Sequence, residues 1–301
     1  MLALISVFVI LAGWSIFGRY FQVRVFERSA KKEEGIKLLS YNVRVFNQYS
    51  MEQGNSVLDS VLCFITSQNA DIVCFQEFFT VNDHEKSSEQ YIDSMLNEFP
   101  DKHISYVYKP GTTSNYGLAT YSKYPIIRRG RVKFKNSNNS CLFSDLVIHN
   151  DTLRVYNTHL QSINLKKENY NFVDSLVFRF NSKRMDEVKD ISGRLKNAFI
   201  KRAEQADILS RHIRQSSYSV IVCGDLNDTP VSYTYQKVRG ELKDAFVGSG
   251  KGIGNTYRGN FPSFRIDYIL HSKTIRSTDY RIHRINLSDH YPVSCNLSIR
   301  N

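Results

Sequence analysis

Short apolar segments rich in β-branched residues recur along this chain, and three of them in its last third adjoin an acidic motif. The motifs are Gly224-Asp225-Leu226-Asn227-Asp228, Arg265-Ile266-Asp267-Tyr268 and Ser288-Asp289-His290. Short apolar runs of this kind are typical of buried strands. A charged group at the mouth of a buried strand costs free energy unless something pairs with it. Several aspartates and an Asp-His pair therefore predict a shared site for a divalent metal and acid–base chemistry.

The rest of the pattern predicts a single α/β domain over residues 36–301. Strand-like runs cover 36–41, 70–75, 106–108, 118–122, 142–148 and 153–158, and the last two flank a hairpin turn at His149-Asn150-Asp151. Helical spacing is present at 53–67, 88–98 and from about 184 within the polar stretch 161–216. No Ser/Gly-rich linker divides the domain. Short mixed strands with few helices indicate two packed sheets flanked by helices.

The composition favours a globular protein with an anionic partner. A hydrophobic content of 42% excludes disorder, and the net charge of +11 suits nucleic acid, phospholipid headgroups or a phosphorylated small molecule. Residues 161–205 hold ten Lys or Arg against six Asp or Glu, which fits either a solvated helix face or a basic wall beside the site. The five cysteines form no CxxC pair, so we interpret them as small buried hydrophobic residues.

The N-terminus carries an uncharged apolar stretch from Met1 to Gly18. A spanning helix needs about 20 such residues, and Tyr20 and Phe21 extend the stretch. A cleaved signal peptide normally opens with basic residues, whereas here the basic residues follow the stretch, starting at Arg19. We therefore predict a single membrane anchor at 1–21 and a juxtamembrane linker at 22–35. The positive-inside rule favours a cytoplasmic domain if Met1 is the native start, and the side of the membrane stays open.

Seven short motifs, in order, resemble those of the endonuclease/exonuclease/phosphatase superfamily, which includes deoxyribonucleases, abasic-site endonucleases, neutral sphingomyelinases and inositol polyphosphate 5-phosphatases. The motifs are Leu39-Ser40-Tyr41-Asn42-Val43-Arg44, Phe75-Gln76-Glu77, Gly117-Leu118-Ala119-Thr120-Tyr121-Ser122, Asn157-Thr158-His159-Leu160, Gly224-Asp225-Leu226-Asn227, Ile266-Asp267-Tyr268 and Ser288-Asp289-His290. Each motif alone is weak, but the ordered set over residues 36–300 is specific. The resemblance implies a four-layer α/β sandwich and a magnesium-dependent phosphoesterase.

The chemistry of phosphodiester hydrolysis agrees with that implication. The reaction needs an activated water and neutralisation of charge on the phosphoryl oxygens. Magnesium prefers oxygen ligands and keeps several waters, so a few protein oxygens suffice. Glu77 at a strand end is the best carboxylate ligand, Asn42 offers an amide oxygen, and Asp289 adds a second carboxylate. Manganese is possible in place of magnesium.

His290 is the candidate general base, because a carboxylate on its other ring nitrogen can set its pKa near neutrality. The resemblance implies that Asp267 orients this histidine and that His159 contacts the phosphate. Asp225 would orient or deprotonate the attacking water, and Asn227 would donate to a phosphoryl oxygen.

The substrate stays open at this point. A basic run between Lys109 and Lys135, interleaved with tyrosines, suits a nucleic-acid backbone or an anionic bilayer. We expect a nuclease or phosphodiesterase first and a lipid or small-molecule phosphoesterase second. A membrane-tethered binding protein without activity is a third reading. No obligate protein partner is evident.

Overall fold

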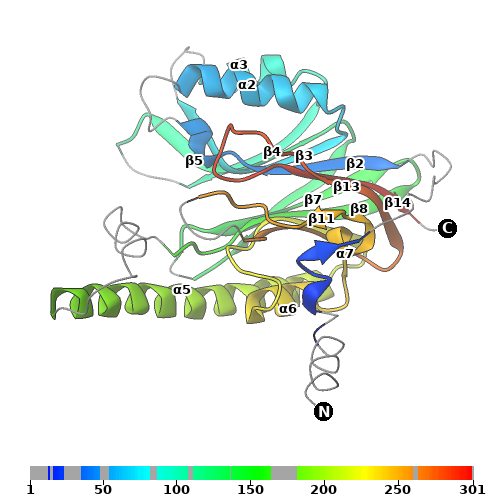
Figure 1. The fold of residues 1–301 in the computed structure, drawn as a ribbon. Coiled ribbons are helices and arrows are strands. Elements are labelled where there is room, and N and C mark those ends of the chain that lie inside the picture. Colours follow the sequence, from blue (N-terminus) through cyan, green and yellow to red (C-terminus); the bar gives the residue numbers. More distant parts are fainter. Residues whose placement is uncertain are drawn as a thin grey trace.

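A computed structural model gives the fold and describes residues 13, 16–23, 35–47, 54–81, 87–107, 111–135, 137–163, 182–259 and 264–299. Two six-stranded sheets pack face to face, and helices lie on the outer face of each sheet (Figure 1). The sequence prediction of two packed mixed sheets flanked by helices is therefore confirmed.

The first sheet mixes one parallel pair with antiparallel neighbours. Its strands in spatial order are β13 (Ile275–Ile282), β14 (Val293–Ile299), β2 (Ile36–Asn42), β3 (Ile72–Val81), β5 (Ser114–Ser122) and β4 (Asp101–Val107). β2 and β3 are the parallel pair. Leu38 of β2 packs in the core between the sheets, and its neighbour Leu39 packs on the helix side. Both faces of this strand are therefore buried, and all of its residues except Lys37 are buried.

The second sheet has the same mixed character. Its strands in spatial order are β10 (Lys243–Asp244), β12 (Asp267–His271), β9 (Ser219–Asp225), β8 (Asp151–His159), β7 (Ser140–Ile148) and β6 (Ile126–Lys133). β8 and β9 are parallel. The predicted hairpin joins β7 to β8, and His149 turns the chain with a φ of 53°.

Five helices complete the layers in the described part of the chain. They are α2 (Gly54–Ser67), α3 (Glu89–Met95), α5 (Ser182–Arg214), α6 (Tyr233–Arg239) and α7 (Ala245–Ser249). Apolar residues of α2 and α3 cover the first sheet, and those of α5 and α6 cover the second. A third apolar cluster fills the space between the sheets. The three apolar clusters therefore separate four layers, which are stacked in the order helices, sheet, sheet, helices.

Helix α5 is longer than the second sheet, which it covers, and the N-terminal half of the helix extends beyond the edge of the sheet (Figure 1). Ala198 is the first buried residue among those whose side chains are described, and Arg202 is buried one turn later. At about 1.5 Å per residue, roughly 30 Å of helix precede Arg202. The predicted helix in the 161–216 stretch is therefore present, and only its C-terminal part packs on the domain.

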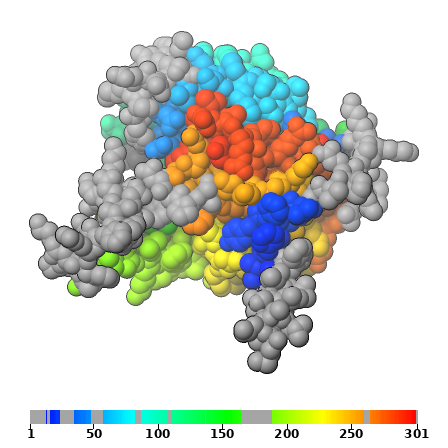
Figure 2. Space-filling model, viewed as in Figure 1, coloured from blue at the N-terminus to red at the C-terminus, as the bar shows by residue number. Residues whose placement is uncertain are grey.

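The chain near the N-terminus docks on the domain. β1 (Phe21–Gln22) pairs with β11 (Gly252–Ile253), and this segment lies over the residues drawn in yellow and orange (Figure 2). Arg19 donates to the carbonyl of Pro230 at 3.0 Å. Phe21 therefore belongs to a strand, whereas the sequence predicts that it extends a membrane span. The physical reason is that its backbone groups find strand partners.

Among the described residues, we find no helix with the length and apolar character required to cross a membrane. Most of the predicted anchor at 1–21 and most of the predicted linker at 22–35 lie outside those residues. Both assignments stay predictions.

Candidate active site

The carboxyl ends of the two parallel strand pairs meet at one edge of the sandwich. Asn42 ends β2, with Gln76 of β3 opposite it. In the second sheet, His159, Asp225 and Asp267 lie opposite one another across β8, β9 and β12. Residues in register on adjacent strands project to the same face. That face meets the other sheet, since the amide of Asn42 donates to a carboxylate oxygen of Asp225 at 3.1 Å.

Asp225 lies at the centre of the cluster and is only 1% exposed. Its carboxylate accepts from the backbone N–H of Asn227 at 2.7 Å and from the side-chain amide of Asn227 at 3.2 Å. The Nε2 atoms of His159 and His290 each lie 3.7 Å from its Oδ2. Burial raises the pKa of Asp225 to about 6, although the two histidines favour the ionised form.

His290 contacts two carboxylates, one on each side of its ring. Its Nδ1 donates to Asp267 at 3.0 Å, and Nε2 faces Asp225. Burial lowers the pKa of His290, but the charges of Asp267 and Asp225 outweigh burial and raise it to about 10. The sequence predicts a pKa near neutrality because it pairs His290 with one carboxylate only. With two carboxylates, the imidazole is protonated at neutral pH.

Glu77 lies in a β-bulge of β3. The pairing with β5 shifts register between Phe75 and Phe78, and Glu77 has a φ of 52°. A positive φ is strained for a residue with a side chain, and such strain is often found at functional sites. The bulge re-aims the side chain toward the sheet edge, where Oε1 lies 3.8 Å from Nε2 of His159. Burial raises the pKa of Glu77, and His290 offsets part of this rise.

A left-handed turn, η1 (Arg44–Asn47), follows Asn42 and has four consecutive φ values between 46° and 54°. The backbone N–H of Arg44 donates to Oδ1 of Asn42 at 3.1 Å, and its guanidinium contacts Asp289 at 3.3 Å. Asn47 donates to the carbonyl of Leu287 at 2.9 Å. The turn thus connects the end of β2 to the loop that carries Asp289.

His159 is held neutral at the same edge. Burial lowers the pKa of its imidazole, and Nε2 has no hydrogen-bond partner among the described residues. A buried polar atom without a partner is uncommon and often marks the place of a ligand or a water. Here the atom faces Glu77 and Asp225.

All eight predicted site residues converge at this edge. They are Asn42, Glu77, His159, Asp225, Asn227, Asp267, Asp289 and His290. Their individual roles stay predictions. The arginines of the Leu39–Arg44 motif and of the Arg265–Tyr268 motif differ from each other in exposure. Arg44 has a side chain that is 52% exposed beside Asp289, whereas Arg265 is fully buried against Asp244.

Several supporting residues have no role in the sequence prediction. Gln76 and Asn157 form a buried link between the sheets, with the amide of Gln76 donating to Oδ1 of Asn157 at 2.7 Å. Ser288 donates to the carbonyl of Asn42 at 2.8 Å and accepts from the backbone of His290 at 3.2 Å. The available signal is a polar residue inside an apolar run, since buried polar groups need hydrogen-bond partners.

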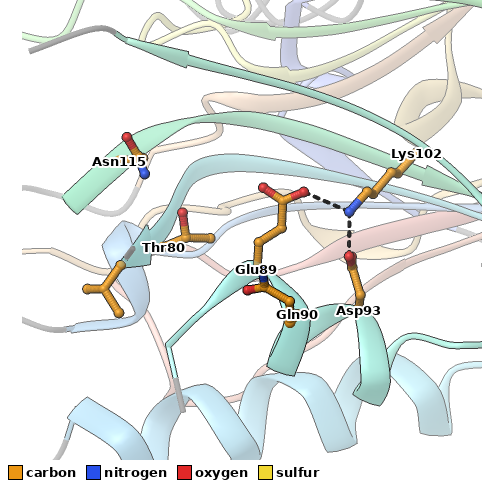
Figure 3. Close-up of a pocket in the computed structure, with 7 residues that line it drawn as sticks. Thr80, Glu89, Gln90, Asp93, Lys102 and Asn115 are labelled. Carbon is orange, nitrogen blue, oxygen red and sulfur yellow. Dashed lines mark hydrogen bonds and ion pairs between the residues drawn. The ribbon is translucent and has the colours of Figure 1, made fainter. Parts of the chain in front are cut away.

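A polar pocket of about 530 Å³ lies apart from this cluster, between α3 and the ends of β3 and β5 (Figure 3). Lys102 donates to Glu89 at 2.7 Å and also to Asp93, and these residues line the pocket with Thr80 and Asn115. The charges in the pocket are paired with each other, so the pocket has the character of a surface ion-pair network.

Comparisons with solved structures show the same fold. An endonuclease/exonuclease/phosphatase from Bacteroides vulgatus has a TM-score of 0.65 and 18% identity, covering 89% of this chain and 100% of that one. Sphingomyelinase C from Streptomyces griseocarneus has a TM-score of 0.58 and 18% identity, covering 89% and 99%. Truncated TDP2 from Caenorhabditis elegans has a TM-score of 0.58 and 17% identity, covering 87% and 97%. At these identities the likeness concerns the fold alone.

Comparison with curated proteins found no match. The sequence model of the Endonuclease/Exonuclease/phosphatase family matches residues 39–290. This match spans all eight site residues and most of the chain, so the protein belongs to the Endonuclease/Exonuclease/phosphatase family.

Proposed function

We propose that this protein is a divalent-metal-dependent phosphodiesterase in which an activated water attacks phosphorus. The observation that carries the proposal is the charge imbalance at the sheet edge. Four carboxylates, those of Glu77, Asp225, Asp267 and Asp289, lie around two facing cations, Arg44 and protonated His290. When all four are ionised, the cluster carries two negative charges in excess. Part of this excess is buried, at Asp225 and Asp267, and is costly there without a compensating cation. One divalent ion neutralises the excess.

The donor set fits a hard cation. Glu77, Asn42 and Asp289 would hold the metal, as the sequence predicts, because all three supply oxygen ligands. Magnesium or manganese suits such ligands. Asp225, Asp267 and His290 also offer ligand atoms within 4.8 Å of one another. In that set His290 would bind through Nε2, because Nδ1 is engaged by Asp267, and its raised pKa keeps Nε2 protonated, which favours the oxygen set. When bound, the ion would neutralise charge on the phosphoryl oxygens.

The protonation states favour a division of work between Asp225 and His290. Near neutral pH most of the Asp225 carboxylate is ionised while His290 is protonated. Asp225 is therefore the group that can accept a proton from the attacking water. His290 would contribute positive charge and a hydrogen bond to a phosphoryl oxygen, with Asp267 fixing its ring. We therefore propose Asp225 as the general base, whereas the sequence predicts that role for His290.

Asn227 and His159 would complete the phosphate contacts. The amide of Asn227 uses both N–H donors, one to Asp225 and one to the carbonyl of Leu160 at 3.0 Å. The bond to Leu160 orients the amide, and a contact to a phosphoryl oxygen would replace the bond to Asp225. The neutral imidazole of His159 has an unpartnered Nε2 facing the cluster. In the tautomer that protonates Nε2, it would donate to a phosphoryl oxygen.

Nucleic acid is our first candidate substrate, with a phospholipid headgroup second. The net charge of +11 and the exposed Arg44 beside the site favour a polyanion. The uncharged segment Met1–Gly18 favours the lipid, because an anchor would raise the local concentration of membrane substrates. We propose that this segment anchors the protein in a membrane by a single span.

A hydrolysis panel with the full-length chain in detergent tests these proposals. It compares duplex DNA, single-stranded DNA, RNA, sphingomyelin, phosphoinositides and a bis-aryl phosphodiester, with Mg²⁺ or Mn²⁺ and with EDTA. Asp225→Asn and His290→Ala should lose turnover, and Asp93→Asn in the separate pocket should retain it. Turnover that survives exhaustive EDTA would refute the metal proposal. Metal binding without hydrolysis of any substrate would favour the binding protein.

A further inference from the structure

Helix α5 buries a guanidinium and an amide about one turn apart on the face that packs against the domain. Arg202 is 1% exposed and Gln205 is 3% exposed, whereas Ala206 and Leu209 on the same helix pack in the apolar core of this layer. Residues three apart lie on one side of a helix, so the two side chains act on the same neighbour. Burying a guanidinium is costly without full partners, which makes the identity of those partners informative.

Both side chains bond to Gln161, two residues beyond His159. The backbone N–H of Gln161 donates to Oε1 of Gln205 at 2.9 Å, and its carbonyl accepts from Nη1 of Arg202 at 2.8 Å. β8 ends at His159, so the strand ladder does not satisfy these backbone groups. The carbonyl of Leu160, the residue between His159 and Gln161, accepts from the side-chain amide of Asn227 at 3.0 Å.

Arg202 also reaches the second loop of the site. Its Nε donates to the carboxylate of Asp228 at 3.2 Å, immediately after Asn227. Asp228 is fixed further by the hydroxyl of Tyr268, which donates to its backbone carbonyl at 2.7 Å. One buried guanidinium therefore bonds to the loop after His159 and to the loop after Asp225.

We propose that Arg202 and Gln205 are positioning residues that clasp these two loops and so fix His159 and Asn227 relative to Asp225. This inference rests on the proposed function, because it treats the two loops as catalytic. Without the clasp, the backbone of Gln161 loses both partners. The preceding residue, Leu160, is still held by Asn139 and by the backbone of Asp225, but it loses the support of a fixed neighbour. Strand pairing places Asp225 itself, so the clasp affects the positions of the residues around Asp225 and not that of Asp225.

Another buried ion pair of the same kind provides a matched control. Arg154 and Asp145 form a bidentate pair at 2.6 and 2.7 Å in the second sheet, and their side chains are 8% and 2% exposed. Arg154 precedes His159 by five residues along β8, about 17 Å from it. Arg154→Met therefore removes a buried guanidinium without touching either loop.

The test measures kcat and KM for the bis-aryl phosphodiester in Arg202→Met, Arg202→Lys, Gln205→Leu and Arg154→Met. We expect kcat to fall about 100-fold in Arg202→Met with little change in KM, because a displacement of about 1 Å costs that much. Arg202→Lys should recover part of the loss, since an ammonium can still pair with Asp228. Gln205→Leu should lose less than Arg202→Met. Arg154→Met should lose stability but retain kcat.

Hydrogen exchange at the Gln161 amide provides a readout that does not require activity. Exchange should become at least about tenfold faster in Arg202→Met and Gln205→Leu and stay unchanged in Arg154→Met under native conditions. An unchanged kcat in both α5 variants, or equal losses in Arg154→Met, would overturn the proposal. If the native chain hydrolyses none of the substrates, the proposed function fails. The exchange measurement then still decides whether the clasp exists, and unchanged exchange refutes it.

Discussion

Two clusters of buried charge, around Arg265 and around Asp225, lie close together in this domain and differ in how completely their charges are satisfied. The guanidinium of Arg265 donates to both oxygens of Asp244 at 2.5 Å and to the carbonyl of Arg19 at 2.7 Å. It also lies between the rings of Phe246 and Tyr268. In the other cluster, the Asp225 and His290 charges stand 3.7 Å apart. The first cluster has the character of a structural pair, and the second retains unsatisfied charge that a ligand can use.

The two clusters are adjacent in the sequence as well. Arg265 and Asp267 belong to one motif, yet Arg265 packs toward α7 and the N-terminal segment while Asp267 holds His290. Their contrast indicates that a short bidentate contact distinguishes a structural charge from a functional charge, even two positions apart, although Nε of Arg265 has no hydrogen-bond partner among the described residues. The following variants test that contrast.

The largest expected effect is on turnover in Asp225→Asn. Loss of a proton acceptor should lower kcat about 10²- to 10⁴-fold. Stability should not fall with it. The folded-state pKa of Asp225 is raised to about 6, so its ionised form opposes folding above its ordinary pKa, and the amide removes that penalty. Urea unfolding at pH 8 checks the second point. A large loss of stability would show that Asp225 is structural.

Arg265→Met should show the opposite behaviour. It leaves Asp244 buried without its partner, which costs about 3–5 kcal/mol of unfolding free energy. Lys273→Met is the matched control, because its pair with Glu241 is 60% and 89% exposed and should contribute little to stability. Denaturant unfolding measures both. Equal, small losses would mean that the Arg265 cluster is not the structural member of the comparison.

A divalent metal ion should raise the unfolding free energy of the protein by binding at the Asp225 cluster and not at the Arg265 cluster. At about 100 times its Kd, a bound ion adds roughly 2.7 kcal/mol to the unfolding free energy. Glu77→Gln should weaken this increment, whereas Glu241→Gln on an exposed carboxylate should retain it. Thermal unfolding with Mg²⁺, Mn²⁺ or EDTA measures the increment. An equal increment in Glu77→Gln would place the metal on other ligands.

The smallest effect is a pH dependence with two limbs. Asp225 must be ionised, so kcat/KM should rise about tenfold per pH unit below its pKa of about 6. His290 must be protonated, so kcat/KM should fall as pH rises through about 10. Burial lowers the pKa of His159, so His159→Ala should retain the alkaline limb. A profile that instead rises through neutrality and stays high would favour His290 as the base.

Local patterns predict most of the fold and the membership of the site. Alternating apolar residues fix which face of a strand is buried, and a polar residue at the end of such a run lies at the sheet edge. Asn42, Asp225 and His159 follow this rule directly. The predicted helices at 53–67 and 88–98 match α2 and α3 closely for the same local reason.

The sequence by itself determined the order of the motifs along the chain, their positions at strand ends, the acidic character of the edge and the residue types available for chemistry. Only the tertiary structure decided which charges meet. Arg202 bonds to a loop 41 residues away, and β1 pairs with residues 230 or more positions later. The pKa of His290 depends on a second carboxylate from another strand. The physical reason is that burial and Coulomb energy depend on distance in space, which local sequence patterns do not encode.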